Sequence, residues 1–212
     1  MKSVRIVFSK MGSAKYVSHL DLVRAMTRAV RRADIPLWYT EGFNRHPYLT
    51  FAAPLSLGYE GLRETMDIRM QEDFPFDDVI IRLNAVLPEG LVAISASDVV
   101  AKAGDLAASE YRLTIDLPVA IIKEALSAPE LLVEKRTKKK TMKTIDILPY
   151  FKNSLVEAMG EKTVVTVTLP SGGAENVNPG LFITALKGIV GTDFDFEVLR
   201  LRLLLADGSE FL

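Results

Sequence analysis

The fold is decided first at residues 18–40, SHLDLVRAMTRAVRRADIPLWYT. The hydroxyl of Ser18 can cap a helix, and Asp21 falls at the third helical position, where its charge suits the positive end of the helix dipole. Pro36 cannot continue the helix, because its ring fixes φ and it has no backbone N–H. We therefore expect a helix over 18–34, followed by a short strand.

Apolar side chains on one side of this helix predict that it packs on a sheet. They recur at helical spacing: Leu22, Met26, Ala29 and Ala33. Further along the chain, alternating and β-branched runs predict strands, and longer amphipathic runs predict helices. In the first half we expect strands over 4–9, 37–40, 49–57, 65–70 and 91–101, and helices over 18–34 and 76–87. In the second half we expect strands over 111–117, 131–135, 144–148, 163–169 and 196–205, and helices over 119–128 and 179–190.

The order of these elements predicts an α+β fold built from tandem ferredoxin-like units. Each half follows β-α-β-β-α-β with additions, which is the ferredoxin-like order. The predicted domains are an N-terminal half over 1–105 and a C-terminal half over 106–212, joined near a stretch of small residues. A single larger α+β domain is the alternative.

The composition excludes several classes of site. The chain has 212 residues, of which 49% are hydrophobic and 25% charged, as in ordinary globular proteins rather than disordered ones. It has no Cys, which excludes disulfides, Cys-ligated metals and cysteine nucleophiles, and its two His leave little material for a metal site. We expect no metal and no cofactor. The first ten residues lack a signal-peptide pattern and no apolar run approaches a membrane span, so a cytoplasmic protein is expected.

Charge is segregated along the chain, although the formal net charge is −1. Residues 1–70 hold 11 Lys+Arg and 6 Asp+Glu, a net of +5. Residues 71–130 hold 4 and 11, a net of −7, and residues 131–212 hold 11 and 10, a net of +1. A uniformly basic nucleic-acid binder is excluded, but local cationic patches are predicted.

The first cationic patch lies on the predicted helix opposite its apolar side. It consists of Arg24, Arg28, Arg31 and Arg32, which share one face at 100° per residue. The helix carries carboxylates only near its ends, at Asp21 and Asp34. Two interpretations stay open: an ordinary solvated face, or a face that binds an anionic partner.

The second patch is a run of cations in a predicted hairpin turn. It consists of Lys135, Arg136, Lys138, Lys139, Lys140 and Lys143. This run is either a solvated loop or an electrostatic clamp on phosphates. No aromatic residue lies between Leu131 and Pro149, so stacking on unpaired bases is not expected there.

A third group of polar residues lies around the start of the predicted helix and in the turn that follows Thr40. It includes Lys10, Lys15, Ser18, His19, Asp21, Glu41, Asn44, Arg45 and His46. His19 and His46 are weak candidates for general acid–base catalysis if the strands bring them together. A binding role and a purely structural role for both imidazoles stay open as well. The chain contains neither HExxH nor GxxxxGK[ST].

Residues 16–68 resemble the signature of the radical-SAM-linked protein family, a bacterial domain of unknown function found next to, or fused to, a cobalamin-binding radical SAM protein. The matching pieces are Ser18-His19-Leu20-Asp21, Arg24, Arg28, Arg31, Arg32, Gly42-Phe43-Asn44, His46-Pro47, Phe51, Pro54-Leu55, Gly58, Glu64 and Asp67. Arg45 stands where that family usually has Pro. The resemblance implies a radical SAM protein as partner, and its iron–sulfur cluster must belong to another chain, because this one has no Cys.

Three functions are compatible with these patterns. The leading hypothesis is an accessory domain, not an enzyme by itself, that binds an anionic partner such as RNA for a radical SAM enzyme. The predicted binding residues are Lys15, Ser18, His19, Asp21, Arg24, Arg28, Arg31, Asn44, Arg45, His46, Lys135, Arg136, Lys138, Lys139, Lys140 and Lys143. One alternative is a metal-independent RNA-processing or RNA-modifying enzyme that uses His19 or His46, since endoribonucleases of CRISPR systems also pair two ferredoxin-like units. The other is a protein-binding scaffold that docks the radical SAM partner.

Overall fold

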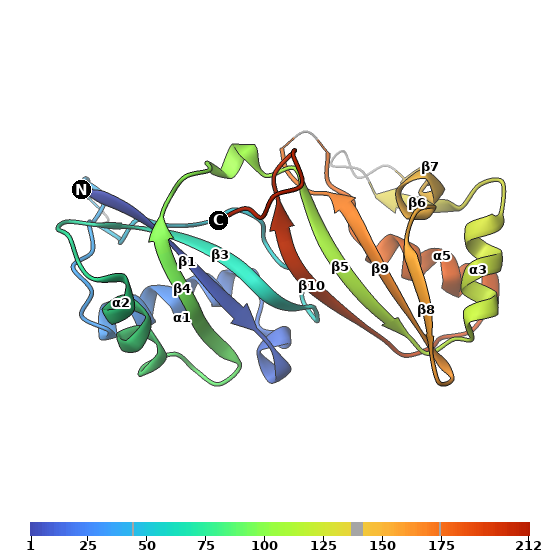
Figure 1. Ribbon diagram of the computed structural model, residues 1–212, viewed down its shortest axis with the longest axis horizontal. Helices are drawn as coiled ribbons and strands as arrows, with labels where there is room; N and C mark the ends of the chain where they lie inside the picture. Colours follow the sequence, from blue (N-terminus) through green and yellow to red (C-terminus); the bar gives the residue numbers. More distant parts are fainter. Residues whose placement is uncertain (44, 137–141, 174) are drawn as a thin grey trace. The chain divides into compact units, whose positions relative to one another are not determined.

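Helices and mostly antiparallel strands alternate along the chain in the computed structural model, which describes residues 1–43, 45–136, 142–173 and 175–212 (Figure 1). The α-helices are α1 (His19–Arg32), α2 (Phe76–Asn84), α3 (Val119–Ser127), α4 (Leu148–Phe151) and α5 (Gly180–Val190). The strands are β1 (Lys2–Lys10), β2 (Leu49–Phe51), β3 (Glu60–Met70), β4 (Leu91–Asp98), β5 (Ala108–Ile115), β6 (Leu132–Arg136), β7 (Met142–Asp146), β8 (Leu155–Met159), β9 (Lys162–Pro170) and β10 (Phe196–Leu204). The predicted α+β class is confirmed.

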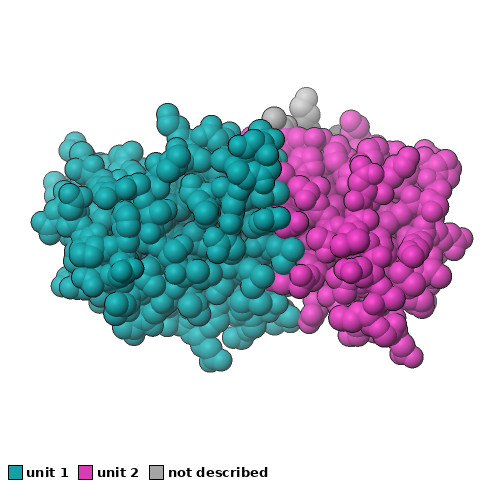
Figure 2. Space-filling model, viewed as in Figure 1, with its two compact units in different colours: residues 1–107, 200–212 teal, residues 108–199 magenta. Residues whose placement is uncertain are grey.

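The chain forms two compact units. Unit 1 comprises residues 1–107 and 200–212, and unit 2 comprises residues 108–199 (Figure 2). β10 therefore begins in unit 2 and ends in unit 1. The domain division predicted from sequence, 1–105 and 106–212, stays a prediction, and the two compact units are described separately below.

Unit 1 contains an antiparallel sheet in the order β4-β1-β3-β2. Its elements follow each other as β1-α1-β2-β3-α2-β4. Alternate side chains of β1 and β3 point to the same face, because the side-chain period of a strand is two. This face and the two helices enclose the main core, which includes Val4, Ile6, Phe8, Leu22, Met26, Val30, Met66, Ile68, Met70, Val79 and Leu83.

α1 forms as the sequence predicts, but it ends two residues before the predicted end. The Asp21 N–H donates to Ser18 Oγ at 3.2 Å, so the predicted cap is confirmed. All four residues of its predicted apolar face are buried. The helix ends at Arg32 rather than at residue 34, and Asp34 adopts a positive φ of 51° just before Pro36.

The strand predicted over 37–40 does not form. This segment makes only isolated bridges, from Leu37 to Met70 and from Tyr39 to Pro47. The run predicted over 49–57 is a strand only as β2. Two short pairings with β3 therefore take the place of the two longer strands that the apolar residues suggested.

Unit 2 contains an antiparallel sheet in which β9 lies between β5 and β8, and β10 lies beside β5. α3 follows β5 and α5 precedes β10, while the hairpin β6-β7 and α4 are inserted before β8. The rings of Phe151 and Phe182 stack at 4.7 Å in its core. Two elements were not predicted, β8 and α4. β8 is mostly exposed, so it lacks the alternating pattern by which a half-buried strand is predicted.

Candidate functional site

α1 presents four arginines on its exposed side, and we call Arg24, Arg28, Arg31 and Arg32 the arginine face. Arg24 Nη1 donates to Asp21 Oδ1 at 3.1 Å, so its charge is partly neutralised. The hydrogen bond from Ser18 Oγ to Asp21 Oδ2, and after it the bond from Arg24, hold the pKa of Asp21 below its usual value. Arg32 Nη2 donates to the carbonyl of Val86 at 2.7 Å and thereby ties α1 to the end of α2.

The uncompensated part of the arginine face is its middle. Within the described part of the chain, no carboxylate forms an ion pair with Arg28 or Arg31. The guanidinium of Arg31 lies 5.6 Å from the ring centroid of Tyr39. Among the described residues, the positive charges of Arg28 and Arg31 are therefore not balanced by an ion pair.

Residues 38–43 and 45–48 form the described parts of a hairpin that extends this surface, and we call it the 38–48 hairpin. Thr40 N–H donates to the carbonyl of His46 at 2.9 Å, and Tyr48 N–H donates to the carbonyl of Trp38 at 3.2 Å. Trp38 N–H in turn donates to the carbonyl of Arg69 at 2.8 Å, which joins the hairpin to the end of β3. In the loop between its two arms, Phe43 is fully exposed, with a relative accessibility of 107%.

The two sides of the 38–48 hairpin both carry aromatic rings beside arginines. Tyr39 contacts Arg31 on the side of α1. Trp38 and Tyr48 lie on the other side, because side chains alternate along each arm. There the guanidinium of Arg69 is 5.4 Å from the Trp38 ring centroid and 4.2 Å from that of Tyr48. This stack was not predicted from the sequence, where the available signal was four aromatic residues within residues 38–48.

The two imidazoles occupy different environments. The ring of His19 meets that of Phe51 edge to face at 5.3 Å, and its Nδ1 is buried without a hydrogen-bond partner among the described residues. Burial, and to a lesser degree the charge of Lys10, lowers the pKa of His19. His46 Nδ1 is 3.2 Å from Thr40 Oγ1 in the 38–48 hairpin.

The positions of these imidazoles do not favour an acid–base pair. His19 is the first residue of α1. His46 lies in the 38–48 hairpin, whose Tyr39 contacts Arg31 near the other end of α1. A helix of 14 residues is about 21 Å long. The shared proton transfer considered from the sequence requires a much shorter separation.

The lowered pKa of His19 predicts how the stability of the protein responds to acid. Protonated imidazole is disfavoured in the folded state, so this contribution to stability is complete above the ordinary pKa of 6.5. It is lost as the pH falls from 6.5 through the lower pKa of the folded state. We expect the free energy of unfolding in urea to decline less between pH 7 and pH 5 in His19→Gln than in the wild type. Equal declines in the two proteins would contradict the prediction.

Beneath the residues that carry the family resemblance lies a buried group of charges that sequence reasoning missed. Arg200 Nε donates to Glu64 Oε1 at 2.8 Å, and Arg200 Nη2 donates to Glu64 Oε2 and, at 2.8 Å, to the carbonyl of Ala53. Lys10 Nζ donates to the carbonyl of Lys15 at 3.2 Å, and burial lowers the pKa of Lys10, with Glu64 opposing that shift. The available signal was Arg200, which interrupts an otherwise apolar run.

A second buried arginine lies on the other face of the β1–β3 sheet. Arg5 Nε and Nη2 donate to the two carboxylate oxygens of Asp67 at 2.7 and 2.8 Å. Arg5 Nη2 also donates to the carbonyl of Ala101, and the ring of Phe211 lies 4.0 Å below the guanidinium carbon. Glu64 and Asp67, two acidic residues of the resemblance, are therefore engaged in holding unit 1 together.

The other predicted site residues are spread between the two units. In unit 1, Lys15 Nζ lies 5.5 Å from the Tyr16 ring centroid, and Arg45 is exposed. In unit 2, Lys143 is exposed on β7 and pairs in register with Lys135. Four predicted binding residues lie outside the described residues: Asn44, Lys138, Lys139 and Lys140. The side chains of Lys135 and Arg136 are also outside the description.

Two further properties bear on the kind of site. In the described ranges, no three His, Asp or Glu side chains come together as a metal would require. No described helix has the length and apolar character to cross a membrane.

Comparison with models of protein families identifies a family for this chain. The model of a family described as "uncharacterized protein conserved in bacteria (DUF2344)" matches residues 3–179, which include residues of both units. No curated protein matches the chain. The match supports a bacterial domain of unknown function, and the partnership with a radical SAM protein stays a prediction.

Proposed function

The chain belongs to the family of uncharacterized proteins conserved in bacteria, and from that premise we propose that it is an accessory domain that binds single-stranded RNA through unit 1. The proposed surface consists of the middle of the arginine face and the 38–48 hairpin. Its central residues are Arg28, Arg31, Phe43 and Arg45.

The full exposure of Phe43 in the hairpin loop carries this proposal. A phenylalanine ring that is exposed on all sides is free to stack on the face of a base. On one side of the 38–48 hairpin lie the arginines of α1, where Arg31 contacts Tyr39. On the other side, the Arg69 guanidinium contacts the rings of Trp38 and Tyr48. Exposed rings that stack on bases, next to cations that neutralise phosphates, are the features that bind unpaired strands.

The charge of α1 supports the same proposal. Like charges three or four residues apart on a helix repel each other, and Arg28 lies four and three residues from Arg24 and Arg31. Phosphates between these guanidinium groups would replace the repulsion by attraction. An ordinary solvated face would more often mix acidic and basic residues.

The proposal includes a role beside a radical SAM enzyme and a tandem ferredoxin-like architecture. The enzyme as partner is supported by the resemblance of residues 16–68, and the chain itself has no Cys to ligate a cluster. The architecture is supported by the β-α-β-β-α-β order in both units, with β6, β7 and α4 as the insertion in unit 2.

Binding of labelled single-stranded RNA to the full chain, measured on filters at 50 and 200 mM salt, tests the proposal. Each neutralised phosphate contributes about −0.7 to the slope of log K against log salt. We therefore expect Arg28→Gln with Arg31→Gln to reduce that slope by about 1.4. Stacking of one base contributes about 1–3 kcal/mol, so Phe43→Ala should weaken binding about fivefold or more.

Two exposed lysines of unit 2 provide the matched control. Lys123→Gln with Lys152→Gln removes the same charge and should leave the slope unchanged. RNA binding that is absent, or that does not fall with salt, would refute the proposal. Cleavage of the RNA that disappears in His46→Ala would favour the enzymatic alternative instead.

A further inference from the structure

The strand β4 leaves one edge of the unit 1 sheet without a neighbour. Within the described chain, β1 is the only strand that pairs with β4. An unpaired edge offers a row of N–H and C=O groups to an added strand, and proteins usually cover or interrupt such an edge.

The first part of the edge is covered by the chain itself. Leu91 N–H donates to the carbonyl of Pro88 at 3.1 Å. The side-chain amide of Asn84 forms hydrogen bonds with both backbone groups of Ala93. Asn84 Nδ2 donates to the carbonyl of Ala93 at 2.9 Å, and the N–H of Ala93 donates to Asn84 Oδ1 at 2.8 Å. Asn84, at the end of α2, thus imitates a neighbouring strand at one position.

The second part of the edge is open. Backbone groups alternate between the two sides of a strand, and the register shift between Val7 and Phe8 leaves Ile94 as the extra residue of a bulge. The backbone N–H and C=O groups of Ala96 and Asp98 therefore point away from β1, as those of Ala93 do. Two outward positions, Ala96 and Asp98, remain where a further strand can bind.

An apolar groove lies directly beside this open part. It has a cavity volume of about 410 Å³ and is lined by Asp77, Ile80, Ile81, Ile94, Ser95 and Ala96. Ile81 and Ile94 expose 67% and 43% of their surface. An extended segment that adds to β4 would place alternate side chains on this groove.

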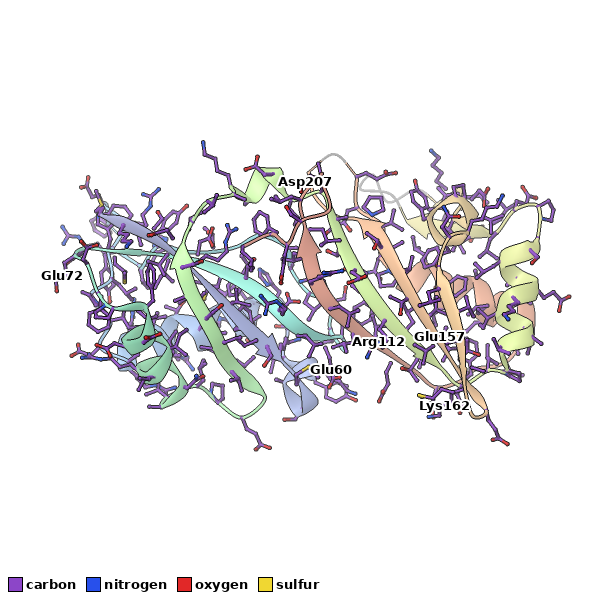
Figure 3. The ribbon with its side chains drawn as sticks, viewed as in Figure 1. Glu60, Glu72, Arg112, Glu157, Lys162 and Asp207 are labelled. Atoms are coloured by element: carbon purple, nitrogen blue, oxygen red, sulfur yellow. The ribbon has the colours of Figure 1, made fainter. Side chains whose placement is uncertain are left out.

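The residues that line the groove, among them Asp77, all belong to the acidic segment 71–98, and this charge selects the kind of partner segment. Residues 71–98 carry one Arg and six acidic residues, which are Glu72, Asp73, Asp77, Asp78, Glu89 and Asp98. Lys2 pairs with Asp98 at 3.1 Å and with Asp73 at 3.9 Å, so the net charge of the patch stays negative. Glu72, labelled in Figure 3, lies in the turn that leads from β3 to α2. A second copy of the chain would bring an identical acidic patch and be repelled, and RNA would be repelled as well.

We propose that the open edge of β4 and the adjoining α2 groove bind an extended segment of a partner protein in which basic and apolar residues alternate. The segment adds to β4 as an edge strand, its apolar side chains cover Ile81 and Ile94, and its cations face the acidic residues of 71–98. This inference is independent of the proposed RNA surface, which lies on α1 and the 38–48 hairpin.

A fluorescein-labelled short peptide of alternating lysine and valine, titrated with the full chain by fluorescence anisotropy, tests the proposal. We expect saturable binding that weakens with salt, and a peptide of alternating glutamate and valine that does not bind. Ile81→Lys should weaken binding at least tenfold, because it removes apolar area and adds a like charge to the groove. Val100→Lys is the matched control, since Val100 is 88% exposed and does not line the groove, and it should bind as the wild type does.

The position of the added strand is read from amide hydrogen exchange. Binding should slow exchange at Ala96 and Asp98, which a merely electrostatic association would not do. The proposal is overturned if the lysine–valine peptide fails to bind, or if Ile81→Lys binds it as tightly as Val100→Lys. A dimer in sedimentation that Ile81→Lys dissociates would assign the edge to a second copy and overturn it too.

Discussion

Replacing Glu64 with alanine is expected to lower the free energy of unfolding by about 3–5 kcal/mol. Glu64 is 4% exposed and accepts two hydrogen bonds from Arg200, which is 2% exposed. Without this carboxylate, the buried guanidinium of Arg200 loses two hydrogen bonds, and the buried amino group of Lys10 loses the negative charge of Glu64. Urea unfolding followed by circular dichroism measures the loss.

The neighbouring residue supplies the control. Arg63 Nε forms an ion pair with Glu210 Oε1, so both pairs join β3 to the C-terminal residues of unit 1. The Arg63 pair is partly exposed, and Arg63→Ala should cost no more than about 1 kcal/mol. A loss in Glu64→Ala no larger than that in Arg63→Ala would show that burial does not govern this pair.

Truncation of Phe211 to alanine is expected to cost about 3–5 kcal/mol as well, for a different reason. Its ring is fully buried among Ala101, Leu106 and Leu203, and it lies 4.0 Å below the guanidinium of Arg5. The variant would leave a cavity on this face of the sheet and admit water to the Arg5–Asp67 pair. Thermal and urea unfolding of the full chain measure the effect.

The last residue of the chain provides the comparison for Phe211. Leu212 is 39% exposed, and Leu212→Ala should change the stability by about 0.5 kcal/mol or less. Equal losses in the two variants would contradict the role given to the Phe211 ring. A large loss confined to Phe211→Ala would support the placement of residues 200–212 within unit 1.

Local signals accounted for much of the fold. The cap at Ser18, the four apolar positions of α1 and the alternation of Met66, Ile68 and Met70 in β3 were all predictable, because each depends on residues within one or two turns or pleats. The strand predicted over 37–40 was wrong for the opposite reason. Its apolar residues suit a strand, but pairing depends on partners that lie elsewhere in the chain, and these provide only isolated bridges.

The candidate site was predictable only as a set of charges. The helical period places Arg24, Arg28 and Arg31 on one exposed face, and that prediction is confirmed by their exposure. The sequence did not show that Asp21 neutralises Arg24, that Arg32 binds the carbonyl of Val86, or that Arg69 stacks between Trp38 and Tyr48. The last two of these contacts join residues that are 21 or more positions apart in the chain, so no local pattern predicts them.

By itself, the sequence determined the α+β class, the amphipathic helix with its arginine face, and the opposite charges of residues 1–70 and 71–130. These properties follow from periodicity and composition, which are local. Only the tertiary structure decided that Glu64 and Arg200, 136 positions apart, form one buried pair, and that β4 has a partly open edge beside an apolar groove. Burial and strand pairing arise when distant segments meet, and they determine whether a charge stabilises the interior of the fold or faces a partner.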